Sequence, residues 1–92
     1  MNSTQLAVAL DARTGIGAAM ASDITKVVFE LIAAELAAGG KVSLSGFGSF
    51  EARDRAARAG RNPQTGAPLV VPAHRSVVFR PAGALRVHVN KD

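Results

Sequence analysis

Residues 60 to 66 read Gly60-Arg61-Asn62-Pro63-Gln64-Thr65-Gly66. This turn-forming stretch lies between two extended segments, and it predicts the hairpin around which the rest of the fold is arranged. Proline fixes φ at a first corner position, and glycine accepts the positive φ that closes a turn, so Pro63 and Gly66 suit the tip. The sequence therefore predicts a ribbon with a proline at its end.

Positive charge is concentrated around this hairpin. The chain has a formal net charge of +4, of which residues 1–50 contribute −1 and residues 51–92 contribute +5. Six of the eight basic side chains in the second part lie in or beside the hairpin, namely Arg53, Arg55, Arg58, Arg61, Arg75 and Arg80. This clustering predicts a polyanionic partner, and the planar guanidinium group matches phosphate oxygens well. The alternative is a solvated basic face that only keeps the protein soluble.

The residues favour double-stranded DNA as the polyanion. A basic two-stranded ribbon can make several phosphate contacts, and a proline at its tip can act as an apolar wedge between base pairs of the minor groove. Two prolines on the outgoing arm, Pro68 and Pro72, have no backbone N–H to donate to the hydrogen-bond ladder of a central strand. They therefore indicate an exposed ribbon. Binding of DNA by an extended arm is the function predicted from these features.

The first forty residues predict a helical hairpin. Apolar residues at helical spacing indicate a short helix over residues 3–13, with Ser3 or Thr4 as its N-cap. After a glycine-containing break, an apolar stripe over residues 20–36 predicts a longer second helix, which Gly39-Gly40 ends by supplying a residue that can adopt the left-handed conformation.

A period of two replaces the helical period after residue 41. Val42 and Leu44 alternate with serines, which predicts a half-buried strand. Gly46-Phe47-Gly48 predicts a tight corner from which Phe47 enters the core. Residues 49–55 are expected to form a strand whose partners are residues 69–71 and 76–79.

A short last helix completes the expected fold. Pro81 suits the first helical position, and a helix over residues 82–89 would pack Leu85 and Val89 inward. The predicted class is α+β, with a helical hairpin base, a three-stranded antiparallel sheet extended into a β-ribbon arm, and a C-terminal helix. The chain is expected to be one domain over residues 1–92. Residues 1–52 and 75–92 would form a dimerisation base, and residues 53–74 would form the DNA-binding arm.

The core of a single chain is expected to be small. Ninety-two residues allow one domain, and only four phenylalanines, with no tyrosine or tryptophan, are available to fill it. A chain of this size buries a modest share of its surface, so a second subunit is expected to complete the core. Phe29, Phe47, Phe50 and Phe79 are the residues predicted to form the core of that dimer.

Several other classes of function have little support in the sequence. The chain has no cysteine, and its two histidines, His74 and His88, are isolated, so neither a metal site nor a cofactor is expected. The glycines at Gly15 and Gly17 follow a predicted helix rather than a strand, and no Gly-x-Ser-x-Gly motif is present. No run approaches the roughly 18 apolar residues of a membrane span. We expect a soluble, cytosolic protein without a leader that is not an enzyme.

The whole chain resembles the bacterial HU and integration host factor family. The resemblance is carried by Gly46-Phe47-Gly48-Ser49-Phe50, by Arg55-Ala56-Ala57-Arg58 leading into the 60–66 turn, and by Phe79. It implies an intertwined dimer whose two arms reach around DNA in the minor groove, a binding mode already described for HU and integration host factor. It also implies that Pro63 is the intercalating wedge and that Arg55, Arg58, Arg61 and Asn62 lie on the backbone or in the groove.

Some positions depart from the family pattern. Ser3, Ala18 and Gly83 stand where lysines are often seen, which leaves open whether flanking DNA wraps along the body. Gln64 replaces a basic residue of many relatives. The last segment looks closer to integration host factor, and the arm looks closer to HU.

The residues and the resemblance together predict a DNA-binding site and a function. The candidate DNA-binding residues are Arg53, Arg55, Arg58, Arg61, Asn62, Pro63, Gln64, Thr65, Arg75 and Arg80. The expected protein is a nucleoid-associated, histone-like homodimer that binds and bends duplex DNA largely without sequence specificity and compacts the nucleoid. The alternatives are a sequence-preferring integration host factor-like subunit, with a paralogue as its partner, and a module that docks another protein. RNA is a further possible ligand.

Overall fold

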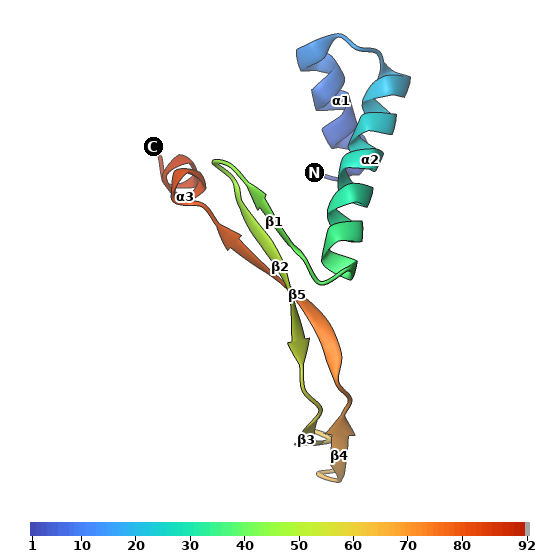
Figure 1. The fold of residues 1–92 in the computed structure, drawn as a ribbon, viewed down its shortest axis with the longest axis vertical. Helices are drawn as coiled ribbons and strands as arrows, with labels where there is room; N and C mark the ends of the chain where they lie inside the picture. Colours follow the sequence, from blue (N-terminus) through green and yellow to red (C-terminus); the bar gives the residue numbers. More distant parts are fainter. Residues whose placement is uncertain (92) are drawn as a thin grey trace. The chain divides into compact units, whose positions relative to one another are not determined.

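The fold combines helices with antiparallel strands, and the computed structural model describes residues 1–91 (Figure 1). Its elements in chain order are α1 (Ser3–Thr14), α2 (Ala18–Ala37), β1 (Lys41–Leu44), β2 (Gly48–Arg55), β3 (Arg58–Arg61), β4 (Pro68–Val71), β5 (His74–Pro81) and α3 (Gly83–Val89). The chain divides into two compact units, one ending at Glu35 and the other beginning at Leu36. The predicted α+β class is confirmed. The predicted boundaries between a base and an arm stay a prediction.

The N-cap of α1 is Asn2, so the predicted capping by Ser3 or Thr4 is wrong. The backbone of Asn2 is extended, with φ −116° and ψ −179°, whereas the chain is already helical at Ser3. The Asn2 side chain accepts the Gln5 N–H at 2.8 Å, and the Gln5 side chain accepts the Asn2 N–H at 2.9 Å. This reciprocal capping box satisfies two backbone donors that the helix itself leaves unpaired.

The helical hairpin forms as predicted, and glycines end both helices. Gly15 follows α1 with φ 67°, and its N–H donates to the Asp11 carbonyl oxygen at 2.7 Å. The Asp11 carboxylate then accepts the Gly17 N–H at 2.9 Å, which shapes the break before α2. Gly39 has φ 85° after α2, the left-handed conformation expected at a helix end.

The larger sheet has the strand order β1-β2-β5, and all its pairs are antiparallel. This confirms the predicted three-stranded sheet. Residues 69–71 do not pair with β2, however; they belong to β4, whose partner is β3. The prediction of that partner was wrong because the ribbon is interrupted at residues 56–57, opposite Pro72 and Ala73. Pro72 has no N–H that could donate a hydrogen bond to the neighbouring strand.

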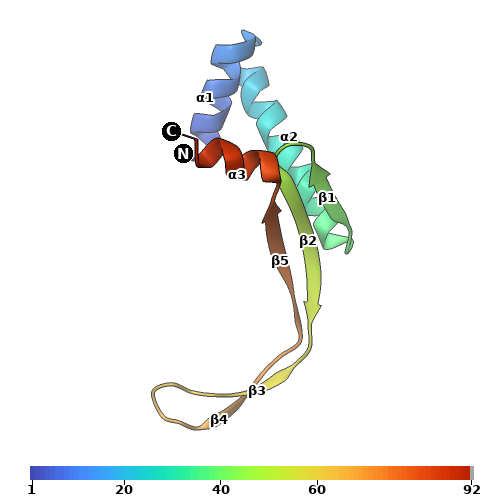
Figure 2. The same cartoon turned by 90° about the vertical axis from the view of Figure 1, so that its left-hand side faces the viewer.

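The interruption leaves the register of the ribbon unchanged. Arg55 faces His74 on one side of the break, and Arg58 faces Val71 on the other, so each strand passes two residues without pairing. In Figure 2 the β3–β4 ribbon turns away from the direction of β2 and β5 at this point. The break therefore bends the arm and adds no residue to either strand.

The corner between β1 and β2 is fixed by backbone hydrogen bonds. The Phe47 N–H donates to the Leu44 carbonyl oxygen at 3.0 Å, and Gly46 has φ 76°. The Phe47 carbonyl oxygen then accepts the Ala82 N–H at 2.9 Å, which ties the corner to the start of α3. Pro81 is the last residue of β5 and Ala82 is the N-cap, so the prediction that Pro81 begins the helix was wrong. The extended strand continues two residues beyond Phe79, where the predicted strand ended.

Little of the single chain is buried. The buried apolar residues are Ala7, Ala21 and Leu36, while Phe29, Phe47 and Phe79 are 46%, 45% and 39% exposed. Val89 is 72% exposed, so its predicted inward packing is wrong for the single chain, and so is the burial of Phe47. The apolar stripe of α2 is likewise exposed, because one chain has too few elements to cover it.

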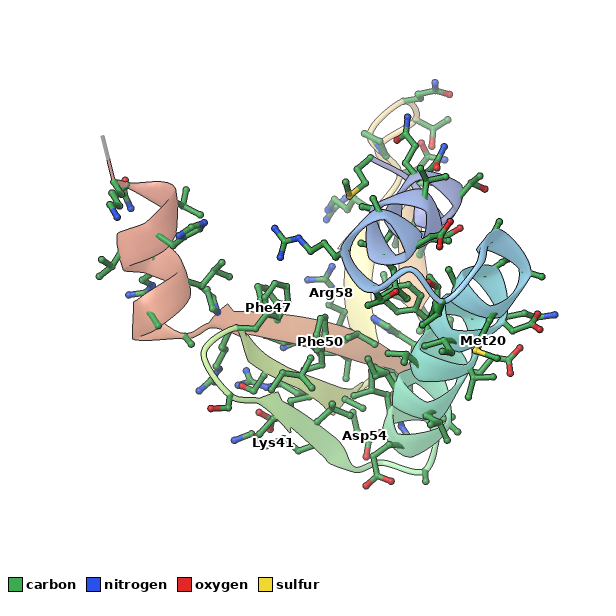
Figure 3. The ribbon with its side chains drawn as sticks, turned by 90° about the horizontal axis from the view of Figure 1, so that it is seen from above. Met20, Lys41, Phe47, Phe50, Asp54 and Arg58 are labelled. Carbon is green, nitrogen blue, oxygen red and sulfur yellow. The ribbon has the colours of Figure 1, made fainter. Side chains whose placement is uncertain are left out.

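The phenylalanines of the second unit form one aromatic cluster. Phe79 packs against Phe50, with ring centroids 4.7 Å apart, and against Phe47 at 5.6 Å, both in tilted arrangements that aromatic rings favour. Figure 3 labels Phe47 and Phe50, which project from the corner and from β2. This cluster is the apolar centre of the sheet.

Candidate nucleic-acid interface

The turn at the tip of the arm is held by its own side chains. The Asn62 side-chain oxygen accepts the Gln64 N–H at 2.9 Å and the Thr65 N–H at 3.4 Å. The Thr65 hydroxyl accepts the Ala67 N–H at 3.2 Å. An asparagine that bonds the backbone two residues on is a standard turn former. These residues thus order the tip, whichever ligand it meets.

The backbone closes the same turn. The Asn62 N–H donates to the Ala67 carbonyl oxygen at 2.9 Å, and the Gly66 N–H donates to the Asn62 carbonyl oxygen at 2.7 Å. Gly66 has φ 70°, as predicted for the residue that closes the hairpin. Pro63 is exposed at the start of the three-residue turn. An apolar ring thereby lies at the solvent end of a short, ordered loop.

The β2–β5 ribbon has a polar face and an apolar face. Side chains alternate across a strand, and directly paired residues share a face. One face carries Lys41, Ser43, Ser49, Glu51, Arg53, Arg55, His74, Ser76, Val78 and Arg80. The other carries Val42, Leu44, Phe50, Ala52, Asp54, Arg75, Val77 and Phe79. Three of the predicted DNA-binding arginines, Arg53, Arg55 and Arg80, are therefore brought together on the polar face.

Contacts within the polar face leave its arginines accessible. The Arg55 Nε donates to the Ser76 hydroxyl at 3.0 Å, and Arg53 lies 3.9 Å from the Glu51 carboxylate with 36% of its side chain exposed. An ion pair this exposed contributes at most about 1 kcal/mol, so a phosphate can replace it. The polar face can therefore receive an anionic backbone.

The outer arm presents arginines on both sides. Arg58 shares one face of β3–β4 with Val71, and Arg61 shares the other with Pro68. Both residues are exposed. One N–H of the Arg61 guanidinium donates to the Gly66 carbonyl oxygen at 3.1 Å, and its remaining donors are available to a ligand. An arm with cations on two faces suits a groove whose two walls are both phosphate chains.

One predicted site residue is directed elsewhere. Arg75 lies on the apolar face, opposite Asp54, and its guanidinium bonds the Asp54 carboxylate and the carbonyl oxygen of Ala37. The structure therefore separates Arg75 from the polar face that holds Arg53 and Arg55. Alternation along the strands could have indicated this, because residues 75 and 80 lie on opposite faces of one strand.

The polar face also contains residues that were absent from the predicted site. Lys41, Ser43, Ser49, Ser76 and His74 contribute polar groups to it. Their positions depend on the pairing of β1, β2 and β5. The strand pattern alone indicated the period but not the cross-strand register, so they were missed.

Charge differs sharply between the two units. Residues 1–35 hold two basic and four acidic side chains, giving −2, and the residues from 36 onward hold nine basic and three acidic, giving +6. The excess of basic over acidic side chains is thus confined to the unit that contains the arm. The helical unit, residues 1–35, instead has a net negative charge.

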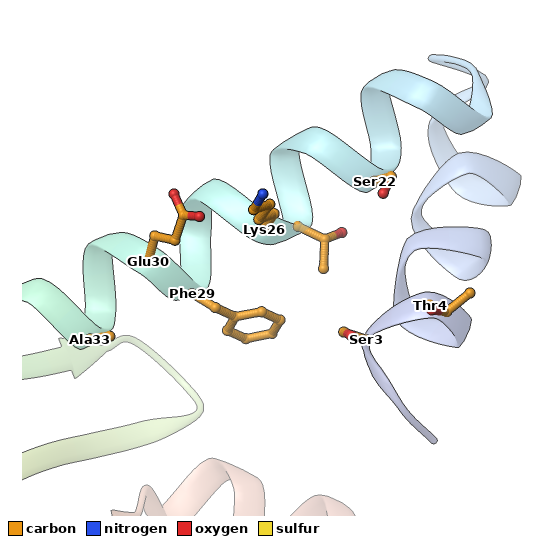
Figure 4. A pocket seen from close by; sticks show the side chains of 8 residues that line it. Ser3, Thr4, Ser22, Lys26, Phe29, Glu30 and Ala33 are labelled. Carbon is orange, nitrogen blue, oxygen red and sulfur yellow. The ribbon is translucent and has the colours of Figure 1, made fainter.

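Grooves in the helical unit are largely apolar. One of about 510 Å³ is lined by Leu6, Leu10, Ile24, Val28 and Phe29, among others. A second, of about 470 Å³, lies between α1 and α2, and Figure 4 shows Phe29 and Ser3 at its sides. Residues 1–91 contain neither a group of three potential metal ligands nor a helix that is long and apolar enough to cross a membrane.

Comparison with known proteins agrees with this arrangement. The family model described as bacterial DNA-binding protein matches residues 1–90. DNA-binding protein HU-1 of Halalkalibacterium halodurans is 46% identical over 90 residues, covering 98% of this chain and 100% of the relative. Integration host factor subunit alpha of Actinobacillus succinogenes is 58% identical over 64 residues, covering 70% of this chain and 65% of the relative.

A solved structure extends the similarity to the fold. The Anabaena HU–DNA cocrystal structure superposes with a TM-score of 0.89 and 35% sequence identity, and the match covers 100% of both chains. The helices, the three-stranded sheet and the arm all fall within that match. By fold, motif and sequence, this chain belongs to the bacterial DNA-binding protein family of HU and integration host factor.

Proposed function

We propose that this protein is a histone-like architectural protein that binds duplex DNA through its β-ribbon arm, largely without sequence specificity, and bends it. The observation that carries the proposal is the exposed Pro63 at the tip of a ribbon whose arginines project outward on its faces. The similarity to a chain solved with DNA supports the same function. Compaction of the bacterial nucleoid, in the cytoplasm, is the role that follows.

In the expected mechanism, the arginines bind the DNA backbone and the proline at the tip bends the duplex. Arg53, Arg55 and Arg80 on the polar face would neutralise phosphates, while Arg58 and Arg61 would line the arm inside the minor groove. Phosphate contacts position a protein without reading sequence. Pro63 would enter a base step and unstack it at a cost of a few kcal/mol, which the added contacts to bent DNA offset. Asn62, Gln64 and Thr65 would order the tip and lie beside the groove.

A dimer is the form expected to bend DNA. The aromatic cluster and the α2 stripe leave large apolar side chains exposed in one chain, including Phe29, Leu31 and Phe47. A soluble chain of this size rarely leaves so much apolar surface uncovered. Two copies would cover it and provide two arms, which can hold a duplex at two points.

The test is a titration of the protein into a random-sequence duplex labelled at both ends, with energy transfer between the labels followed at several salt concentrations. If about six phosphates are contacted, log Kobs falls with log salt at a slope near −5. The expected result is a rise in energy transfer on a duplex of arbitrary sequence. A slope near zero, or binding without approach of the ends, contradicts the proposal.

A sequence-preferring function is the second candidate, because integration host factor subunit alpha is 58% identical over the 64 residues that it shares with this chain. Such a subunit would discriminate strongly against random duplex and could require a different partner chain. Competition between a selected site and random duplex separates the candidates. Equal competition supports the sequence-tolerant protein, and a preference of about 1000-fold or more, typical of specific binding, supports the other.

A further inference from the structure

One arginine of the ribbon makes contacts unlike those of the others. Arg75 pairs directly with Asp54 on the apolar face of β2 and β5. Its Nε donates to Asp54 Oδ1 at 3.1 Å, and its Nη1 donates to the Ala37 carbonyl oxygen at 2.7 Å. A single guanidinium thus joins both strands, at the root of the arm, to the residue that ends α2.

The Ala37 carbonyl is a group that needs such a donor. The last carbonyl groups of an α-helix have no partner within the helix and carry its partial negative charge. The last turn of α2 contains no basic residue. The cation that meets this helix end therefore comes from Arg75, 38 residues further along the chain. Separate N–H groups of one rigid guanidinium can serve the two acceptors together.

The location of this contact gives it a mechanical role. Asp54 and Arg75 form the last pair but one of the β2–β5 ladder, directly before the interruption that bends the arm. A wedge at the tip can bend DNA only if the arm resists rotation at its root. A bond from the ribbon to the last residue of α2 provides that resistance, because it joins the β2–β5 ladder to a helix at the last pair but one before the interruption.

We propose that Arg75 is a positioning residue for the arm, one that anchors the ribbon root to the carbonyl end of α2 instead of binding phosphate. Asp54 holds the guanidinium in the orientation that the anchor needs. The inference rests on the proposed function, since an anchored arm matters most to a protein that bends DNA.

The competing role for Arg75 is a direct phosphate contact, and salt dependence separates the two. Each phosphate that the protein no longer neutralises lowers the magnitude of the salt slope by about 0.9. The matched variants are Arg75→Gln and Arg53→Gln, which remove the same group from the apolar and the polar face. With Arg75→Gln we expect the salt slope to be unchanged and the end-to-end energy transfer to be reduced. The affinity should stay within about twofold of the parent, as expected when an exposed ion pair is removed. With Arg53→Gln we expect a lower slope.

The partner residue gives an independent check. Asp54→Asn removes a negative charge, which on electrostatic grounds alone would strengthen DNA binding. If Asp54 holds the anchor, this variant instead bends DNA less. Unchanged or increased bending by Asp54→Asn, or a slope in Arg75→Gln that falls as it does in Arg53→Gln, overturns the inference.

Hydrogen exchange tests the anchor without DNA. Arg75→Gln should speed exchange of the amides around residues 37–41 and 74–76, Arg53→Gln should leave them unchanged, and Arg75→Lys should restore part of the protection. Equal protection in all variants contradicts the anchor. If the parent protein fails to bind duplex DNA, the proposed function fails, and this readout still decides whether Arg75 holds the root.

Discussion

Gly48 lies against the ring of Phe79 so closely that no other residue fits. A Cβ atom at Gly48 would lie 2.7 Å from Phe79 Cε1 and 2.6 Å from the Arg80 carbonyl oxygen. Because one of these neighbours is backbone and the ring is held between Phe47 and Phe50, neither can move aside cheaply.

Gly48→Ala should therefore destabilise the protein by about 1–3 kcal/mol, as overpacking of a filled site does. The matched control is Gly83→Ala, since a Cβ there meets nothing within 4 Å and the residue is helical. That change should be neutral or stabilising by up to about 1 kcal/mol. Chemical denaturation at one protein concentration measures both. Equal stability of the two variants would show that the Phe79 ring can move aside to make room for the added Cβ atom.

Pro63→Ala should reduce bending more than binding, because the substitution removes the apolar wedge and keeps the charged ribbon. Pro68→Ala makes the same chemical change on the outgoing strand, in the pair with Arg61 that adjoins the turn and not in the turn itself, and should leave bending intact. End-to-end energy transfer at saturating protein gives the bend, and a salt titration gives the affinity. Full bending by the Pro63 variant would reject intercalation.

Arg58→Ala should weaken binding to duplexes of any sequence. The exposed Arg58 makes no hydrogen bond within residues 1–91 through its side chain, so the substitution removes a phosphate ligand without disturbing the ribbon. The magnitude of the salt slope should fall by about 1 if Arg58 neutralises one phosphate. Lys26→Ala removes the same charge from α2, an element that is not part of the ribbon, and should leave the slope unchanged. Similar effects in both variants would indicate a response to net charge alone.

Asn62 has two roles at the tip that substitutions can separate. Asn62→Ala removes the acceptor of the Gln64 and Thr65 amides, and should speed their hydrogen exchange at a cost of up to about 1 kcal/mol in local stability. Asn62→Asp keeps the acceptor and adds a negative charge, so the turn should stay protected while DNA affinity drops. If the aspartate variant binds as tightly as the parent, position 62 lies away from phosphate.

Phe29 should control assembly. Its side chain is 46% exposed in the single chain and lines both large grooves of the helical unit. If a second copy covers it, Phe29→Ala should raise the dimer dissociation constant by at least about tenfold, given that truncating a buried phenylalanine costs about 3–5 kcal/mol. Val70→Ala, on the arm at 74% exposure, is the control. Sedimentation over a range of concentrations checks both, and a monomeric parent would contradict the proposed dimer.

The sequence predicted the order of the elements and the chemistry of the arm, because both depend on local rules. The glycine after each of the first two helices, the change to a period of two after Lys41, and the turn around Pro63 and Gly66 each have a local physical cause. The small core indicated a second subunit, and the family resemblance added the intertwined form of the expected dimer. Local patterns were sufficient for these features.

Features that depend on distant pairing could not be predicted in the same way. The direction in which Arg75 points follows from its register with Asp54, and its bond to Ala37 spans 38 residues. The cap of α1 was missed because Ser3, Thr4 and Asn2 are all good capping residues, and only the backbone of Asn2 is extended. The exposure of Phe47 and Val89 reflects the absence of covering elements in one chain.

The unshifted register across the break in the arm restricts how this ribbon can change in length. Arg55 faces His74 before the break and Arg58 faces Val71 beyond it. Inserting one residue into a single strand would turn every side chain beyond it to the opposite face. The arm can therefore lengthen or shorten in evolution only by matched changes on both strands, so insertions and deletions that relatives tolerate here should occur in pairs.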